Sequence, residues 1–172
     1  MTKQKITYNP LTIDQIDFRV QSTTDKGAII LAYKDARCDM KILDDLYGKF
    51  GWKKNYELIN GNLFCTVSVK DPESGEWVSK QDVGTESKTE KEKGQASDAF
   101  KRACFNWGIG RELYDFPFIW INFLPNESSF QFQRRLKKLQ WKLEYDKDNK
   151  VSYLGAVDRD NKKLVYEYKL PN

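Results

Sequence analysis

The sequence predicts an α+β protein, in which an antiparallel three-stranded meander packs on one long helix (a βββα unit) and a small β meander follows at the C-terminus. Two observations lead to this prediction. Residues 82–114 join a polar turn to a long segment with helical apolar spacing, and three short strand-like runs directly precede it. Further alternating runs occupy the last 34 residues or so of the 172 in the chain.

The chain is long enough for one domain with a proper core and too short for two comfortable ones. We therefore expect a core domain over residues 1–125. Residues 126–172 form a C-terminal basic segment and β meander, either part of that domain or packed on it.

The first third of the chain indicates a strand followed by a helix. Residues 28–33 have the length and branching of a buried strand, whereas residues 11–20 mix apolar and charged side chains and leave open a helical turn leading into a strand. Asp35 or Asp39 can cap the next helix, which Gly48 ends. The apolar residues of that helix keep helical spacing: Met40, Leu43, Leu46 and Tyr47.

Three short runs then form the β-rich region: residues 52–59, 63–69 and 76–83. Asn60-Gly61 is the strongest hairpin signal in the sequence, and residues 71–75 make the next turn. In the middle run, one alternating set is apolar and should face the core: Leu63, Cys65, Val67 and Val69. The other set is Phe64, Thr66, Ser68 and Lys70.

The long helix has one apolar side. Its members recur every three or four residues: Ala96, Phe100, Ala103, Cys104 and Trp107. Lys101 and Arg102 then point elsewhere, and Gly108 and Gly110 can close the helix. The N-cap candidates are Thr85, Ser87 and Thr89, the last two with Glu90 and Glu92 placed for a capping box.

The C-terminal part begins with a dense apolar stretch, residues 116–123, which is either core or covered by a neighbouring subunit. Residues 125–129 are a predicted linker. A basic cluster follows: Arg134, Arg135, Lys137 and Lys138. Alternating apolar residues over 139–153 and 164–170 then predict the second meander.

The composition limits the chemistry. A net charge of +4 is compatible with a polyanionic partner. The chain has no histidine, which removes the usual general base and zinc ligand, so we expect neither an enzyme nor a cofactor. The three cysteines are far apart and predict reduced structural thiols. Without a membrane-length apolar run or a signal-peptide core, we expect a cytoplasmic protein with no membrane partner.

Two motifs resemble a known family. Asp82-Val83-Gly84, followed by residues 96–103 (ASDAFKRA), resembles the signature of the single-strand annealing proteins of the Rad52 superfamily, and most of all their bacteriophage branch, the Sak-type recombinases. Upstream, residues 33–37 (YKDAR) resemble the start of the same family's first helix, together with Leu43-Asp44, Gly48 and Trp52. The resemblance covers residues 28–120.

The resemblance implies a βββα domain that assembles into rings or filaments and lays single-stranded DNA in an outer groove. Such proteins anneal complementary strands without ATP in homologous recombination or double-strand break repair. The absence of a GxxxxGK[ST] loop agrees with this. The resemblance also implies a phage-encoded protein in the cytoplasm of a bacterial host, with single-stranded DNA and further copies of the same chain as partners. A single-strand DNA-binding protein or an exonuclease would be a further partner.

The resemblance also implies DNA-binding residues. Lys101 and Arg102 match the family's paired basic residues in the inner groove, Arg37 matches another residue of that groove, and Lys70 matches one of a second DNA site. Phe105 stands where a further arginine is expected, and Lys49 where an aromatic residue is expected. The candidates to supply the missing charge are Lys49 and Arg111.

Two alternatives involve DNA. Asp71 followed by Glu86 and Lys88 has the D…ExK order of some Mg²⁺-dependent nucleases, although here Glu86 and Lys88 lie in a polar, helix-starting segment and not on a strand. The aromatic-rich strands also allow a plain single-strand binding barrel, with Trp52, Phe64, Trp77 and Trp141 as candidates, although such aromatics are more often core. The remaining alternative is a scaffold without a DNA role.

Overall fold

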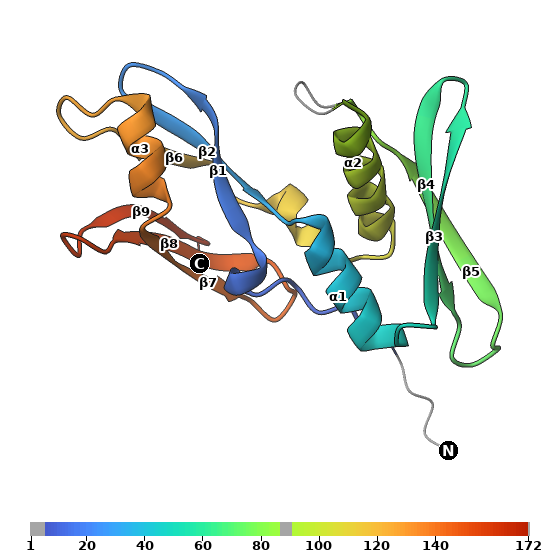
Figure 1. Cartoon of the computed structure of the whole chain (residues 1–172). Helices are drawn as coiled ribbons and strands as arrows, with labels where there is room; N and C mark the ends of the chain where they lie inside the picture. Colours follow the sequence, from blue (N-terminus) through green and yellow to red (C-terminus); the bar gives the residue numbers. More distant parts are fainter. Residues whose placement is uncertain (1–5, 87–90, 172) are drawn as a thin grey trace. The chain divides into compact units, whose positions relative to one another are not determined.

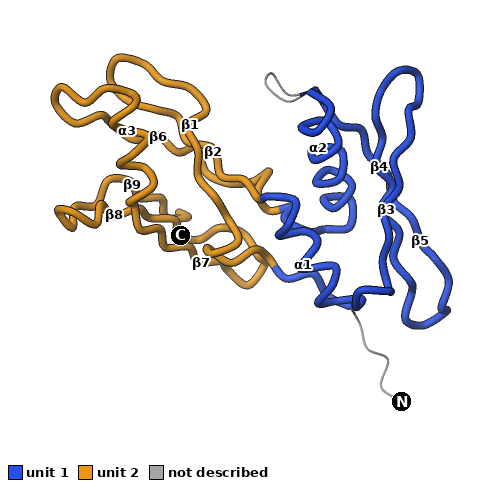
Figure 2. The backbone as a smooth tube through the Cα atoms, viewed as in Figure 1, with its two compact units in different colours: residues 1–9, 35–111 blue, residues 10–34, 112–172 orange. Residues whose placement is uncertain are grey.

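The computed structural model describes residues 6–86 and 91–171, and these form three α-helices and three three-stranded antiparallel sheets (Figure 1). The α+β class is therefore confirmed. The chain divides into two compact units, unit 1 (Met1–Asn9 and Asp35–Arg111) and unit 2 (Pro10–Lys34 and Glu112–Asn172), as Figure 2 shows. These boundaries differ from the predicted domains, 1–125 and 126–172, because unit 2 combines the N-terminal hairpin with the C-terminal sheet.

Unit 1 contains five regular elements: α1 (Ala36–Tyr47), β3 (Trp52–Ile59), β4 (Asn62–Lys70), β5 (Trp77–Val83) and α2 (Lys91–Asn106). The strands pair antiparallel in the order β3-β4-β5. Asn60 and Gly61 join β3 to β4 with φ angles of 51° and 77°. Two consecutive positive φ values are what a two-residue type I′ turn requires, and β3 and β4 pair antiparallel across it, so the predicted hairpin is confirmed.

Local side-chain contacts fix the ends of α1. Asp35, one of the two predicted caps, accepts hydrogen bonds from the backbone N–H groups of Arg37 (2.8 Å) and Cys38 (3.0 Å). Asp39 is instead buried inside the helix. After the C-cap at Gly48, Trp52 Nε1 donates to Asp44 Oδ1 at 2.8 Å, which ties the start of β3 back to α1.

The core of unit 1 lies between α2 and the sheet. Its buried members are Leu43, Cys65, Val67, Val69, Ala99, Phe100, Ala103, Cys104 and Ile109. The predicted inward residues Phe100, Ala103 and Cys104 are confirmed as buried. Ser68, expected on the outer face of β4, is buried as well, and its hydroxyl forms a hydrogen bond with that of Ser79 at 2.8 Å.

Unit 2 holds two sheets, in the orders β1-β2-β6 and β7-β8-β9. The strands are β1 (Asp17–Thr23), β2 (Gly27–Tyr33), β6 (Ile119–Asn122), β7 (Leu139–Tyr145), β8 (Val151–Asp158) and β9 (Leu164–Lys169). The segment left open by the sequence is a 3-10 turn, η1 (Ile13–Gln15), leading into β1. A second 3-10 turn, η2 (Arg111–Asp115), precedes β6. The predicted C-terminal meander is confirmed.

Unit 2 also contains a helix that the sequence analysis missed, α3 (Ser129–Leu136). Its first residue, Ser129, lies in the predicted linker over 125–129. The Ser128 hydroxyl accepts from the Gln131 N–H (3.2 Å) and Gln131 Oε1 accepts from the Ser128 N–H (2.8 Å), so a capping box starts the helix. Phe132 and Leu136, one turn apart, bury its inner face.

None of the helices among residues 6–86 and 91–171 has both the length and the apolar character needed to cross a membrane.

Candidate nucleic-acid interface

Lys101 and Arg102 follow Phe100, which is completely buried against the sheet. Successive helix residues are turned by about 100°, so two residues after a buried one cannot share its direction. Both side chains are accordingly only partly buried, and 40% of the Arg102 side chain is exposed. The packed side of α2 thus holds a pair of adjacent cations in a fixed position.

Arg102 contacts an acid within unit 1. Its Nε lies 3.5 Å from Asp82 Oδ1 at the end of β5. The same carboxylate accepts from the N–H of Val83 at 2.7 Å, and its Oδ2 accepts from Asn106 Nδ2 at 3.3 Å. Asp82 therefore positions the Arg102 guanidinium and partly neutralises it.

The Asp82-Val83-Gly84 motif also lets α2 pack closely. A Cβ atom at Gly84 would lie 2.2 Å from the Gln95 carbonyl oxygen and 2.7 Å from the Ala99 nitrogen. Only glycine allows this approach. Gln95 Nε2 in turn donates to the Gly84 carbonyl at 3.2 Å.

Of the predicted N-caps of α2, Ser87 and Thr89 lie outside the described residues, as does Glu90. Thr85 has another partner: its N–H (2.9 Å) and its hydroxyl (3.1 Å) both donate to Asp98 Oδ2, about two turns into the helix. These bonds tie the segment after β5 to the side of α2.

Arg111 forms hydrogen bonds with the C-terminal end of α2. Its Nε donates to the Phe105 carbonyl and its Nη2 to the Asn106 carbonyl, both at 3.0 Å. Lys80 Nζ donates to the same Asn106 carbonyl at 2.8 Å. The last carbonyls of a helix lack partners inside it, so these two cations cap the helix. Arg111, a predicted DNA-binding residue, thus has a structural role in the chain itself.

Arg37 lies in the first turn of α1 and is 89% exposed, but it is paired with Asp35 (Nη2–Oδ2 2.8 Å, Nε–Oδ2 3.0 Å). Partial burial of Asp35 works against its ionisation. The hydrogen bonds from the Cys38 N–H and from Arg37 nevertheless prevail and lower its pKa. The carboxylate that caps α1 therefore also holds the Arg37 guanidinium.

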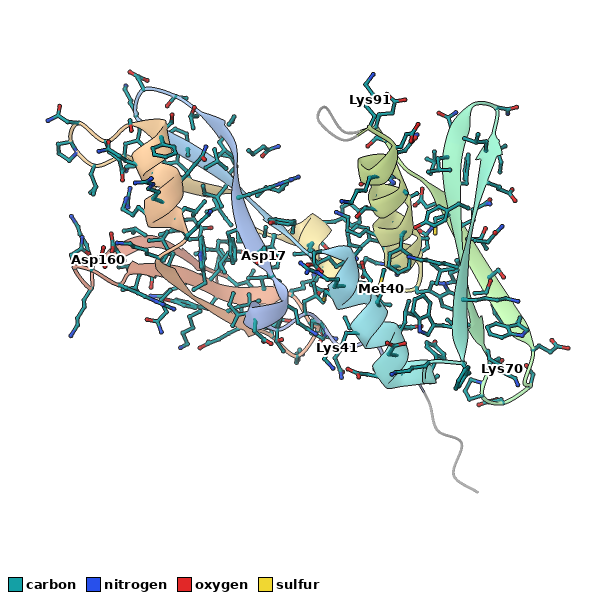
Figure 3. All side chains as sticks on the ribbon, in the orientation of Figure 1. Asp17, Met40, Lys41, Lys70, Lys91 and Asp160 are labelled. Carbon is teal, nitrogen blue, oxygen red and sulfur yellow. The ribbon has the colours of Figure 1, made fainter. Side chains whose placement is uncertain are left out.

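Lys49 and Lys70 are both exposed. Lys49 follows the C-cap of α1, beside Phe50, whose surface is 96% exposed. Lys70 ends β4 (Figure 3), next to Val69, which is buried against α2. Because strand side chains alternate, Lys70 lies on the sheet face opposite α2. The structure thus places Lys70 on a different face of unit 1 from Lys101 and Arg102.

The strand register reveals cations that the sequence analysis did not single out. Lys54 and Lys80 both pair with Val67, so they flank the α2-facing side of the sheet, and Lys54 Nζ lies 4.4 Å from the centre of the Phe100 ring. Lys53 faces the other way, with its Nζ 4.3 Å above the Trp77 ring. The sequence does show that Lys53 and Lys54, as neighbours in one strand, face opposite sides of the sheet. Only the strand register shows which of the two faces α2.

The nuclease residues are not brought together. Asp71 follows Lys70, which pairs with Trp77 at one end of the β4–β5 hairpin, whereas Glu86 follows Val83, which pairs with Phe64 at the other. Six residues of strand, roughly 20 Å, separate these ends. Figure 3 labels Lys70 at one end and Lys91, the partner of Glu86 at 3.7 Å, at the other.

Asp71 itself accepts from the Glu73 N–H at 2.8 Å in the turn, and Lys88 lies outside the described residues. In the part of the chain that the structure describes, no three His, Cys, Asp or Glu side chains are grouped to hold a metal ion. Asp71 and Glu86 cannot ligate one ion together.

Two of the four aromatic residues predicted for a binding barrel are partly buried and pack against the cores of their units. Trp52 stacks on Phe100 with ring centres 6.1 Å apart in unit 1, and Trp141 stacks on Phe18 at 3.7 Å in unit 2. Trp77 is 42% exposed. The sheet that carries Trp52 and Trp77 is an open three-stranded sheet.

The structure thus defines an α+β protein whose sheet and packed helix present paired cations. A family model described as the Rad52/22 family double-strand break repair protein matches residues 2–122, and the chain belongs to this family. The chain is also similar to the single-stranded DNA-binding protein DdrA of Deinococcus deserti (36% identity over 96 residues) and of Deinococcus radiodurans (35% over 97). Each match covers 55% of this chain and 46% and 45% of the two relatives. The chain spans about half the length of the curated relatives it matches.

Proposed function

We propose that this protein binds single-stranded DNA through Lys101 and Arg102 and anneals complementary strands during recombination or double-strand break repair. The observation that carries the proposal is the orientation of α2, whose buried side fixes two adjacent cations beside an open sheet. Family membership and the names of the Deinococcus relatives support it. Arg37 belongs to the same proposed groove, and Lys70 to a second contact on the other sheet face.

The proposed binding is to the sugar-phosphate backbone of the DNA. Lysine and arginine neutralise phosphates and release counterions, so binding is independent of base sequence and weakens steeply with salt. Annealing also requires bases that can pair. A groove that holds the backbone by charge leaves the base edges free, whereas stacking every base on an aromatic residue hides them.

The proposal includes assembly. Each chain offers few phosphate contacts, and self-association into a ring or filament multiplies them along one strand. The β3–β5 sheet and α2 would be the family's βββα unit, within a core domain over residues 1–125. Action without ATP, placement in the bacteriophage branch and cooperation with a single-strand DNA-binding protein or an exonuclease belong to the same proposal. Light scattering with and without an oligonucleotide measures the assembly.

An annealing assay tests the function. Two complementary strands, one with a fluorescent donor and one with an acceptor, are mixed with the protein in the absence of nucleotide. The protein should accelerate duplex formation over the spontaneous rate. A plain single-strand binder would slow it, and a scaffold would show no affinity for single strands at low salt; either result contradicts the proposal.

A further inference from the structure

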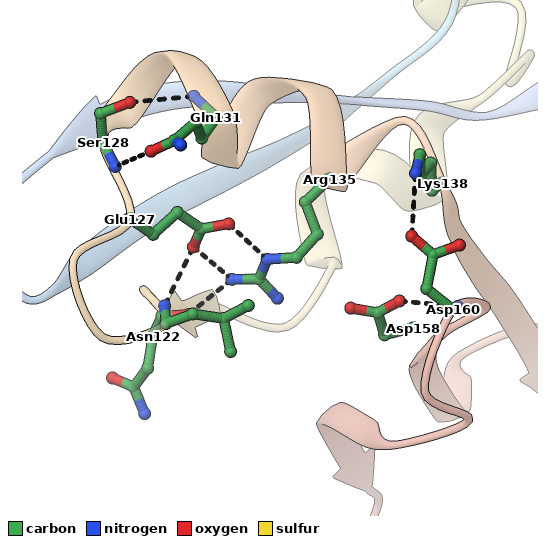
Figure 4. A network of polar contacts seen from close by, with 9 residues as sticks. Asn122, Glu127, Ser128, Gln131, Arg135, Lys138, Asp158 and Asp160 are labelled. Atoms are coloured by element: carbon green, nitrogen blue, oxygen red, sulfur yellow. Dashed lines mark hydrogen bonds and ion pairs between the residues drawn. The ribbon is translucent and has the colours of Figure 1, made fainter.

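Of the four cations in the basic cluster of residues 134–138, two are paired with acids of the same unit and two are not, within the described part of the chain. Arg135 binds Glu127 through Nε (2.7 Å) and Nη2 (2.8 Å), and its Nη2 also donates to the Asn122 carbonyl at 2.9 Å (Figure 4). Only 10% of the Arg135 side chain is exposed. Lys138 Nζ pairs with Asp160 Oδ2 at 2.8 Å. Arg135 is thus part of a buried ion pair, and Lys138 is part of an exposed one.

The other two share one face of α3 with an aromatic residue. Phe130, Arg134 and Lys137 are spaced by four and three residues, so they lie along one side of the helix. All three are exposed, Phe130 at 60%, while Phe132 is buried on the opposite side. Arg134 Cζ lies 4.5 Å from the centre of the Phe130 ring. Within residues 6–86 and 91–171, neither Arg134 nor Lys137 is paired with an acid.

The helix alone does not account for this arrangement. Cations near the C-terminus of a helix interact favourably with its dipole, which accounts for Arg134 in the last turn and Lys137 at the C-cap. The helix dipole does not explain why the Phe130 ring is exposed to solvent next to the Arg134 guanidinium. An aromatic ring and unpaired cations in a row are the features that bind single-stranded nucleic acid, through base stacking and phosphate neutralisation.

We propose that Phe130, Arg134 and Lys137 form an additional contact for single-stranded DNA, in which one base stacks on Phe130 and the two cations bind neighbouring phosphates. The contact lies in unit 2, outside the residues 2–122 that the family model matches. It rests on the proposed function, since it extends single-strand binding to the C-terminal part of the chain.

The charge contribution is tested with Arg134→Ala combined with Lys137→Ala. The matched control is Lys142→Ala with Lys169→Ala, which removes two exposed lysines of the same unit that are paired with Glu144 and Glu167. Affinity for a labelled oligonucleotide is measured from low to moderate salt. The first variant should bind more weakly, with a slope of log affinity against log salt smaller by about 1.4, at 0.7 per phosphate contact. Equal slopes in the two variants overturn the proposal.

The stacking contribution is tested with oligonucleotides that contain 2-aminopurine, whose fluorescence reports stacking. Phe130→Ala should bind roughly fivefold to a hundredfold more weakly at an unchanged salt slope, and it should lose part of the fluorescence change. Phe130→Tyr keeps an aromatic ring and should therefore retain both the affinity and the fluorescence change of the wild type. A Phe130→Ala protein with wild-type fluorescence change and affinity overturns the proposal. Because Phe130 is exposed, thermal unfolding of both variants should match the wild type.

The two proposals fail in different ways. If Lys101→Ala with Arg102→Ala weakens binding while the α3 variants bind like their control, the contact on α3 is wrong and the proposed function stands. A wild-type protein without affinity for single strands at low salt overturns both.

Discussion

The Nε atom of Arg102 lies 3.5 Å from Oδ1 of Asp82, so one of the two cations proposed to bind DNA is already near a carboxylate of its own chain. Both side chains are partly exposed, 40% for Arg102 and 24% for Asp82. A partly exposed ion pair of this length contributes little free energy. A DNA phosphate can therefore compete with Asp82 for the Arg102 guanidinium. The negative charge of Asp82 then reduces the attraction between Arg102 and the phosphate.

Asp82→Asn should strengthen single-strand binding, because it removes a negative charge next to the proposed phosphate site and releases Arg102. The expected gain is several-fold at low salt and decreases as salt screens the charges. The measurement is a fluorescence anisotropy titration with a labelled oligonucleotide. Asp45→Asn is the control, since Asp45 is an exposed acid of unit 1 paired with Lys41. Equal affinities of the two variants would contradict the role given to Asp82.

Replacing Lys101 and Arg102 together with alanine should weaken binding sharply and leave the fold intact, because both side chains are partly exposed. Two lost phosphate contacts should reduce the salt slope for single strands by about 1.4. The control is Lys41→Ala with Lys91→Ala, two exposed lysines of unit 1 in surface ion pairs. Wild-type binding by a double variant with a normal circular dichroism spectrum would rule out this site.

Much of the fold could be predicted because its signals are local. The spacing of Phe100 and Cys104, the Asn60-Gly61 turn and the Asp35 cap each involve residues a few positions apart. α3 was missed although Ser128 and Gln131 form a capping box that is visible in the sequence, since only two buried residues support so short a helix.

The candidate site was less predictable, because its electrostatics depend on tertiary contacts. The pairing of Arg102 with Asp82 joins residues 20 positions apart, and the pairing of Lys138 with Asp160 joins residues 22 apart. The charge of Arg111 makes it a DNA-binding candidate in the sequence, yet its guanidinium donates to two carbonyls at the end of α2. A sequence shows which residues are charged, but the fold decides which charges are used internally.

Phe100→Ala should lower the free energy of unfolding by about 3 to 5 kcal/mol, because it empties the centre of the unit 1 core between α2 and β4. Chemical denaturation followed by circular dichroism measures the change. Phe50→Ala is the matched control: its ring is 96% exposed, and it should change the free energy of unfolding by no more than about 0.5 kcal/mol. Similar losses in both variants would contradict the assignment of the core.

The stability of unit 2 should depend on pH through Glu127. Burial of this carboxyl group opposes its ionisation, but the hydrogen bonds from Arg135 and from the Leu124 N–H prevail and lower its pKa from the ordinary 4.5. A carboxyl group whose pKa is lowered on folding stabilises the folded state at pH values above its pKa in the unfolded chain. This contribution is lost as the pH falls through the pKa of the folded state.

At pH 7, Glu127→Gln should lower the free energy of unfolding by roughly 3 to 5 kcal/mol, because Arg135 loses its charged partner in a buried site. The wild-type contribution declines once the pH falls below the ordinary 4.5 and is lost as the pH passes the lowered folded pKa, so the difference in unfolding free energy between the two proteins should narrow. Thermal unfolding from pH 7 to pH 3 measures it, with Glu144→Gln, an exposed acid of the same unit, as control. A gap between wild type and Glu127→Gln that stays constant across this range would show that the ionised pair does not stabilise α3.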